Sequence, residues 1–339
     1  MSAKRSGEIT PGVICVSVVV TAHNAAATIG ACLRAISRQN GFSPRELEIV
    51  LIDDRSSDGT LRAATSVGLE NLVVRRIEEG PPPGLTSRQA ALDLGISLAS
   101  APIVCLTDAD SVPSPDWIAS LQAALQTGAD LVSGPVLFEP QATWLGAFQT
   151  VDAAFYMAWC RMLAALGFEG GVLFGNAAFP VETYRRIGGF EAIGQTLTED
   201  LAFARAVRRR GLRTVYLPAA RVSVRACSSR TELIERAART STGGFSALFA
   251  TLTGWMLMLP ALGLAAWISE STWLWMALAV RYGAGLLFNL ATTFRAGGRR
   301  ALAAAAIYDV VVLTLGAWVL IRTRRQRQVT WGGITYDRQ

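Results

Sequence analysis

The sequence has little of what disulfide frameworks and zinc sites are built from. It contains one histidine, His23, and five cysteines that form no close pair. An odd number of scattered cysteines is untypical of a disulfide-rich secreted fold and lacks the spacing of a metal cage. We therefore expect the cysteines at apolar core positions in a reducing compartment. His23 is far in sequence from the acidic motifs, so we do not expect it to bind a metal.

The N-terminus also lacks an apolar run. Its first residues, "MSAKRSGEITPG", are polar, which predicts a flexible segment over residues 1–13 with neither a signal peptide nor a membrane anchor. The sequence shows no internal repeat and no low-complexity tract. Its 339 residues suffice for one large domain or two ordinary ones.

Charged residues are few, at 17%, whereas apolar residues make up 51% and the mean hydropathy is +0.33. The apolar excess is concentrated in residues 241–321, where we expect a membrane region of two or three helices, followed by a basic tail over residues 322–339. The candidate spans are residues 246–268, 272–294 and 301–321. An earlier helical stretch, residues 144–168, is interrupted by Asp152 and Arg161. We expect it to lie against the membrane surface or the core and not to span.

The net charge is +6, and arginine clusters at residues 295–300 and 322–327 adjoin the apolar segments. This placement favours cytoplasmic membrane flanks over a nucleic-acid site. Three full crossings would put the second cluster outside, against the positive-inside rule, which favours one re-entrant or interfacial segment. Arg281 and Asp309 lie inside candidate spans. Because lone charges there are costly, we expect these two to pair between adjacent helices.

Strand-like and helix-like segments alternate along the first part of the chain, which predicts an α/β fold with a parallel sheet. In such sheets a ligand binds outside the carboxyl ends of the strands. Two of the predicted strands stop on acidic residues. Asp53, Asp54 and Asp58 follow one strand, and Asp108 and Asp110 follow another. The acids therefore fall where a ligand is expected.

The stretch "TDAD" places Asp108 and Asp110 at a strand end. Two carboxylates this close are costly to bury unless a cation or strong donors accompany them. Oxygen ligands of this kind suit Mg²⁺ or Mn²⁺ shared with a substrate diphosphate, whose charge the metal neutralises. Taken alone, the motif is common, and two solvated loop aspartates explain it as well.

The stretch "IDDRSSDGT" has two explanations that can hold for different residues. A carboxylate of Asp53 or Asp54 can accept a hydrogen bond from a base N–H or a ribose hydroxyl, whereas Asp58 or Ser57 can cap the next helix.

A third acidic motif, "LTEDLAF", opens a predicted helix with Glu199 and Asp200. The helix dipole favours the ionised carboxylate that a general base requires, so we expect this position to keep the base charged. Ordinary acidic decoration of a helix start explains the motif when it is taken alone.

The three acidic motifs in this order make residues 14–240 resemble the family 2 inverting glycosyltransferases, which have the Rossmann-like GT-A fold. "SVVVTAHN" is similar to the family's opening strand and nucleotide loop, "IDDRSSDGT" to its uridine-binding motif and "LTDADS" to its Asp-x-Asp metal motif. "GNAAFPVETYRRIGGF" resembles the acceptor-side segment, and "TEDLAFARAVRRRG" the motif that supplies the base. The resemblance implies a nucleotide-sugar-binding catalytic domain followed by transmembrane helices.

The resemblance implies a UDP-sugar site with a divalent metal, Mg²⁺ or Mn²⁺. Asp53 and Asp54 would hold uracil and ribose, and Asp108 and Asp110 the ribose and the metal-bound diphosphate. Asp58 would instead cap the following helix. For Arg88, the basic residue that the resemblance places near the nucleotide, an exposed helix arginine is an equally good explanation. The donor-site residues it implies are Thr21, Asn24, Asp53, Asp54, Arg88, Asp108 and Asp110.

The implied reaction is a single in-line displacement with inversion. Asp200 would take the proton from an acceptor hydroxyl while the hydroxyl oxygen attacks the sugar C1 opposite the UDP. The residues implied on the acceptor side are Gly175, Asn176, Glu199, Arg236, Arg239 and Trp331.

Two segments bear on the acceptor. "RAART" resembles the Gln/Arg-x-x-Arg-Trp motif of processive enzymes and ceramide glucosyltransferases, with Thr240 in place of the tryptophan, which disfavours a growing polymer. A basic helix approaching the membrane is the alternative explanation of its arginines. "VTWGGITY" partly resembles the ending of ceramide, hopanoid and carotenoid glycosyltransferases, although Gly332 and Ile334 stand where arginines are expected. An unstructured tail is the alternative there.

We therefore expect a multi-pass enzyme of the inner membrane that transfers a hexose once to a lipid hydroxyl at the cytoplasmic face. Within the enzyme class, the alternative is a polyisoprenyl-phosphate glycosyltransferase or a polysaccharide synthase. From another class, the alternative is an inactive relative that serves as a scaffold or sugar-nucleotide sensor, and the three intact acidic motifs disfavour it.

Overall fold

The structure is a computed structural model that describes the seven segments 14–139, 143–166, 171–240, 247–294, 298–324, 328–331 and 334–337. The chain divides into two compact units. The first comprises residues 1–134 and 172–222, and the second comprises residues 135–171 and 223–339. Residues 1–13, for which a flexible segment was predicted, lie outside the described residues.

A seven-stranded sheet forms the centre of the first unit, in the order β3-β2-β1-β4-β8-β6-β9. Its strands are β1 (Val16–Ala22), β2 (Leu47–Asp54), β3 (Leu72–Ile77), β4 (Ile103–Asp108), β6 (Leu131–Ser133), β8 (Ala177–Pro180) and β9 (Thr214–Tyr216). The prediction of a parallel sheet holds for the first four strands. It is wrong for β8, which pairs antiparallel with both β4 and β6. The sheet is therefore mixed.

Helices cover both faces of this sheet. They are α1 (Ile29–Ser37), α2 (Thr60–Thr65), α3 (Ser87–Leu98), α4 (Trp117–Gln126), α6 (Val181–Ile187), α7 (Gly189–Ile193) and α8 (Glu199–Arg209). A short 3₁₀ helix, η1 (Phe174–Asn176), precedes β8, and two more short strands are β5 (Ser111–Pro113) and β10 (Val222–Val224).

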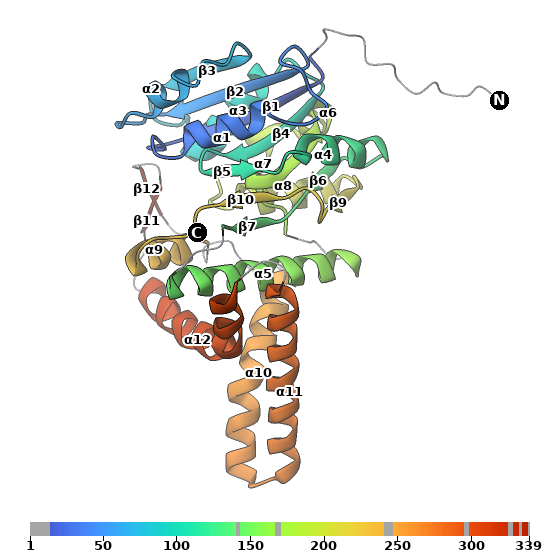
Figure 1. Cartoon of the computed structure of the whole chain (residues 1–339), viewed down its shortest axis with the longest axis vertical. Coiled ribbons are helices and arrows are strands. Elements are labelled where there is room, and N and C mark those ends of the chain that lie inside the picture. Colours follow the sequence, from blue (N-terminus) through green and yellow to red (C-terminus); the bar gives the residue numbers. More distant parts are fainter. Residues whose placement is uncertain are drawn as a thin grey trace, which may run out of the picture. The chain divides into compact units, whose positions relative to one another are not determined.

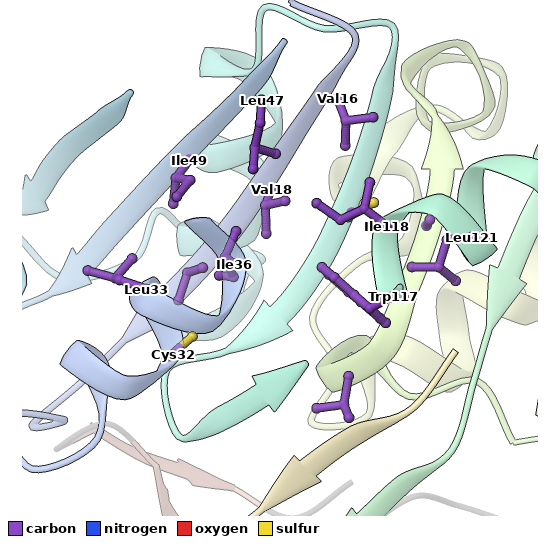
Figure 2. Packing of buried hydrophobic residues seen from close by; sticks show 14 of the residues in the cluster. Val16, Val18, Cys32, Leu33, Ile36, Leu47, Ile49, Trp117, Ile118 and Leu121 are labelled. Carbon is purple, nitrogen blue, oxygen red and sulfur yellow. The ribbon is translucent and has the colours of Figure 1, made fainter. Parts of the chain in front are cut away.

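The apolar run of β1 is buried on both faces, as expected for a central parallel strand. Val16 and Val18 point into one core, which α1 and α4 close with side chains such as Leu33 and Trp117 (Figure 2). Val19 points to the opposite core, which α3, α6 and α8 close. All five cysteines are free thiols and four of them are buried, so the prediction of core positions is largely confirmed.

Helix α3 approaches the sheet closely because Gly95 faces it without a side chain. A Cβ at this position would lie 2.4 Å from Cγ1 of Val19. The start of α3 is fixed by a capping box in which Thr86 accepts from the backbone N–H of Gln89, and the Gln89 side chain accepts in return. The first turn of α3 is thereby held at the carboxyl ends of the strands.

The second unit is mainly helical. Its elements are β7 (Val136–Phe138), α5 (Trp144–Ala165), α9 (Arg230–Thr240), α10 (Ala247–Ser269), α11 (Thr272–Thr293), α12 (Arg299–Arg324), β11 (Gln328–Trp331) and β12 (Ile334–Asp337). Helices α10 and α11 run side by side as a long hairpin, and α5, α11 and α12 pack on one another (Figure 1).

Three helices in the described residues are long and apolar enough to cross a membrane, over residues 250–269, 272–293 and 299–318. Helix α5 is not among them, in agreement with the prediction. The predicted pairing of Arg281 with Asp309 is confirmed, because Nη1 of Arg281 lies 3.0 Å from Oδ2 of Asp309 and both side chains are buried.

Candidate active site

The predicted donor residues meet at the carboxyl edge of the sheet because the strands are in parallel register there. Ala22 of β1 lies beside Asp53 of β2, and Thr21 lies beside Asp108 of β4. The edge therefore gathers acids that are 55 residues apart in the sequence. This is the position at which α/β sheets bind ligands.

Asp53 is buried, and neither of its carboxylate oxygens has a hydrogen-bond partner among the described residues. Nη1 of Arg76 lies 3.8 Å from Oδ2, which is too far for a hydrogen bond. A buried carboxylate in this state is costly, so the site favours a donor from outside the chain. Asp54 differs, because its Oδ1 accepts from Nε of Arg55 at 2.8 Å.

The loops after β1 and β2 hold each other through short polar contacts. The backbone N–H of Asn24 donates to Oγ of Ser56 at 2.9 Å, and Oδ1 of Asn24 accepts from the backbone N–H of Ser57 at 2.8 Å. Asn24 and Arg55 both have positive φ, 52° and 54°, which non-glycine residues adopt rarely and often at functional sites. Sequence reasoning missed Arg55, because a backbone angle of this kind has no clear sequence signal.

Asp58 has a structural role beside the start of α2, although the N-cap residue is Gly59 and not Asp58 as predicted. Its Oδ1 accepts from the backbone N–H of Thr60, the first residue of α2, at 2.9 Å and also from the Thr60 hydroxyl. Its Oδ2 accepts from the backbone N–H of Ala26 at 3.1 Å. His23 lies in the same loop, with Nδ1 2.6 Å from the carbonyl oxygen of Asp54.

Arg88 links the donor-side acids to the start of α8. Its Nη2 donates to Oδ1 of Asp108 at 2.5 Å and its Nε to Oε1 of Glu199 at 2.6 Å, while Nη1 lies 3.5 Å from Oγ1 of Thr21. The side chain is 17% exposed, so the alternative of an exposed helix arginine does not hold. Burial alone would lower the pKa of Arg88, but the charges of Asp108 and Glu199 raise it above its ordinary value.

Asp200 lies next to this cluster with an altered acidity. Burial, and after it the charge of Glu199, raise the pKa of Asp200 to about 7, although the backbone N–H of Leu201 donates to its Oδ1 at 2.7 Å. The expectation that the helix start keeps this group fully ionised is therefore wrong, because loss of hydration outweighs the helix dipole. Burial also raises the pKa of Glu199, against the opposing effect of Arg88. A carboxyl group that titrates near pH 7 is well matched to proton transfer.

The Asp-x-Asp pair fits a metal that is shared with a substrate, and not a preformed cage. Asp110 is exposed in the turn after β4, and Asp108 is partly exposed although it is paired with Arg88. In the part of the chain that the structure describes, no three Asp, Glu, His or Cys side chains group into a metal site. Two carboxylates still suit Mg²⁺ or Mn²⁺ if phosphate oxygens and water complete the coordination.

Two residues predicted on the acceptor side have structural contacts instead. Asn176 is fully buried, its Oδ1 accepts from Nε1 of Trp117 at 2.8 Å, and its Nδ2 donates to the carbonyl oxygen of Ala220 at 2.7 Å. The carbonyl oxygen of Gly175 accepts from Oγ1 of Thr107 at 3.0 Å. Asn176 therefore joins three segments of the first unit, and direct contact with an acceptor does not agree with its burial.

The remaining acceptor-side predictions fall on α8 and on the second unit. Glu199 pairs with Arg88, on the donor side of the cluster. In the second unit the guanidinium carbon of Arg236 lies 4.5 Å from the ring centroid of Phe138. The side chains of Arg239 and Trp331 lie outside the described residues.

A mixed α/β sheet whose carboxyl edge carries these acids, joined to three apolar helices, is the architecture of a membrane-associated GT-A glycosyltransferase. The family model "Glycosyltransferase like family 2" matches residues 11–243, which is more than half of the chain. The chain therefore belongs to this family.

Individual relatives are more distant. The chain is 29% identical over 99 residues to a probable glycosyltransferase, YdaM, of Bacillus subtilis, and 31% identical over 105 residues to the glycosyltransferase AglE of Haloferax volcanii. These matches cover 29% and 30% of this chain but only 23% and 33% of the relatives. A solved mannosyltransferase, PcManGT from Pyrobaculum calidifontis in complex with GDP-Man and Mn²⁺, is 20% identical with a TM-score of 0.47, over 94% of this chain and 88% of its own. Similarity at this level does not extend its ligands to the present chain.

Proposed function

We propose that this enzyme transfers a hexose from a UDP-sugar to the hydroxyl group of a membrane lipid, with inversion at the sugar C1. The observation that carries the proposal is the carboxyl group of Asp200, whose pKa is raised to about 7 next to the Arg88 cluster. A group of this acidity at the edge of a sugar-nucleotide fold is suited to accept the acceptor's proton. Three apolar helices in the same chain favour an acceptor that resides in the membrane.

In this proposal the donor lies along the carboxyl edge of β1, β2 and β4. An N–H of the uracil ring supplies the hydrogen bond that both oxygens of Asp53 lack, and Asp54 accepts from the ribose. Arg88 is a partly buried cation that is held beside Asp108, so it can oppose the negative charge of the diphosphate. Thr21 and Asn24 lie on the adjoining strand end and loop and complete the donor side.

Asp108 and Asp110 would hold a divalent metal, Mg²⁺ or Mn²⁺, together with phosphate oxygens. When bound, the metal neutralises the charge that collects on the departing diphosphate. The proton transfer belongs to Asp200. As the acceptor oxygen bonds to C1 and the bond from C1 to UDP breaks, the hydroxyl proton moves to the carboxylate of Asp200.

Several features of the chain and of its proposed donor support a lipid acceptor at the cytoplasmic face. UDP-sugars are cytoplasmic, which places the catalytic domain on that side, and the arginine clusters flanking the apolar helices favour the same orientation. The partial match of "VTWGGITY" to lipid glycosyltransferase endings also favours a lipid. The missing tryptophan at Thr240 argues against a processive synthase.

The direct test is transfer of radiolabel from UDP-glucose, UDP-galactose and GDP-mannose, each in parallel, into chloroform-extractable lipid. Membranes would contain the wild type, Asp200→Asn or the control Glu182→Gln, which alters an exposed acid that only approaches Arg185 at 4.0 Å. Each would be assayed with Mn²⁺ and with EDTA. We expect lipid label from a UDP-sugar in the wild type and the control, a loss of about 10²-fold or more in Asp200→Asn, and a loss with EDTA.

Other outcomes would separate the alternatives. Label confined to GDP-mannose would overturn the UDP donor. Label in a polymer that chloroform does not extract would replace the lipid acceptor by the polysaccharide alternative. Full activity of Asp200→Asn would remove Asp200 from the role of base.

A further inference from the structure

Helix α12 is long enough to cross a membrane but does not follow the α10–α11 hairpin. Its 26 residues give a length of about 39 Å, against about 30 Å of hydrocarbon. Within the second unit α12 stays at the α5 end of the hairpin and does not reach the turn between α10 and α11 (Figure 1). Strand β11 begins four residues after α12 ends and also lies at the α5 end (Figure 1). Both ends of α12 therefore lie at the α5 end of the α10–α11 hairpin.

One clamp holds α12 to α5 through Tyr308. Its hydroxyl donates to Oδ1 of Asp152 at 2.6 Å, and its ring lies 5.5 Å from that of Phe148 and 5.2 Å from that of Phe155. The three α5 residues are spaced four and three apart, so they share one face of that helix. Ala304, one turn before Tyr308, is also buried, and its small side chain permits close approach of the helices.

A second clamp, on the adjacent residue Asp309, holds α12 to α11. Its Oδ2 accepts from Nη1 of Arg281 at 3.0 Å and its Oδ1 from Nδ2 of Asn289 at 3.0 Å. Gly285 lies between these partners, and a Cβ there would be 2.6 Å from both Nη1 of Arg281 and Oδ2 of Asp309. Arg281 is in turn held by α10, because its Nη2 donates to the carbonyl oxygen of Trp255 at 2.7 Å.

The two clamps point in different directions. Asp309 is held to α11 through Arg281 and Asn289, whereas Tyr308 is held to α5, which is not among the helices of spanning length and composition. An apolar helix bound at its middle to a helix outside the spans cannot run parallel to the hairpin over its full length. We propose that α12 lies in the membrane interface, with both of its ends on the same side of the bilayer, and that the protein crosses the membrane twice.

This topology fixes the partner of the arginines at the two ends of α12. Arg299 and Arg300 are exposed at its start, and the sequence places four more arginines at residues 322–327. Between them the outer face exposes Ile307 and Val310. Apolar residues between two basic ends match a leaflet with anionic headgroups, whose attraction for arginine is short-ranged. If the orientation under the proposed function is right, this is the cytoplasmic leaflet.

The test is side-specific labelling of the full chain with a membrane-impermeant maleimide, in intact and in permeabilised cells. Ser271→Cys reports the turn between α10 and α11, and Thr335→Cys reports β12, whose residue 335 is exposed. The unsubstituted chain measures background from the five native cysteines. An N-terminal epitope tag, detected with antibody before and after permeabilisation, reports the catalytic side. Transferase activity of each variant shows that it is folded.

We expect Ser271→Cys to be labelled in intact cells and Thr335→Cys at least tenfold more weakly until the cells are permeabilised. Equal labelling of Thr335→Cys before and after permeabilisation, with the N-terminal tag protected, would overturn the interfacial placement of α12. Exposure of both the tag and Thr335→Cys in intact cells would refute the cytoplasmic orientation but support two crossings. In an Asp309→Leu background we expect labelling of Thr335→Cys in intact cells to rise. Unchanged labelling would show that Asp309 does not hold α12.

Discussion

Transfer is expected to slow on the acid side of neutrality, because the proposed base must lose its proton before it can accept another. With a pKa of about 7 for Asp200, about 9% of the enzyme is active at pH 6 and about 91% at pH 8. The rate should therefore rise about tenfold over these two pH units. An aspartate with an ordinary pKa near 3.9 would be ionised at both values, and the rate would not change. The measurement is kcat/KM against pH, which reports the free enzyme.

Two substitutions should move the acid limb of this profile in opposite directions. Glu199→Gln keeps the size of the side chain and an acceptor for Arg88 but removes the charge that raises the pKa of Asp200, so the limb should move to lower pH. Arg88→Gln removes a cation that lowers this pKa, so the limb should move to higher pH even though the overall rate also falls. Burial persists in both variants, which limits each movement to about one unit.

The control for this experiment is Glu182→Gln, in which the charge lost is exposed and belongs to α6. Its profile should match that of the wild type. A wild-type limb near pH 4, or the same limb in Glu199→Gln as in the wild type, would show that Asp200 is not the titrating base.

Three stability predictions follow from buried contacts, each measured as a change in thermal unfolding in detergent. Gly95→Ala should cost about 1–3 kcal/mol, because the added Cβ meets Val19; no change would mean that α3 can shift off the sheet. Asn176→Ala should cost about 1–3 kcal/mol for each buried partner it leaves, and Asn176→Asp should not restore both contacts. Arg281→Gln or Asp309→Asn alone should lower the free energy of unfolding by about 3–5 kcal/mol. Exchanging the two residues should recover part of this loss. No recovery would indicate that the surrounding contacts outweigh the pair.

The sequence was sufficient where chemistry is local or strongly periodic. Apolar runs ending in acids located β2 and β4 and the carboxyl edge, because parallel strands end at one side of a sheet. Apolar length located the three helices that are long and apolar enough to cross a membrane. The local sequence also indicated a structural role for Asp58 beside α2; its Oδ1 accepts from the backbone N–H of Thr60, although Gly59 is the N-cap residue.

Only the tertiary structure decided matters that depend on long-range neighbours. The reversal of β8 depends on the path of the chain between strands, which strand propensity does not encode. The pKa of Asp200 depends on how much water its surroundings exclude, and a helix-start motif alone predicted the opposite effect. Asn176 looked like a binding residue in its motif, yet partners 59 and 44 residues away make it structural. For α12, composition gave the length of a span, while its contacts with α5 and α11 show where it is held. A helix's own residues set its affinity for lipid, but its packing partners determine whether it crosses the membrane.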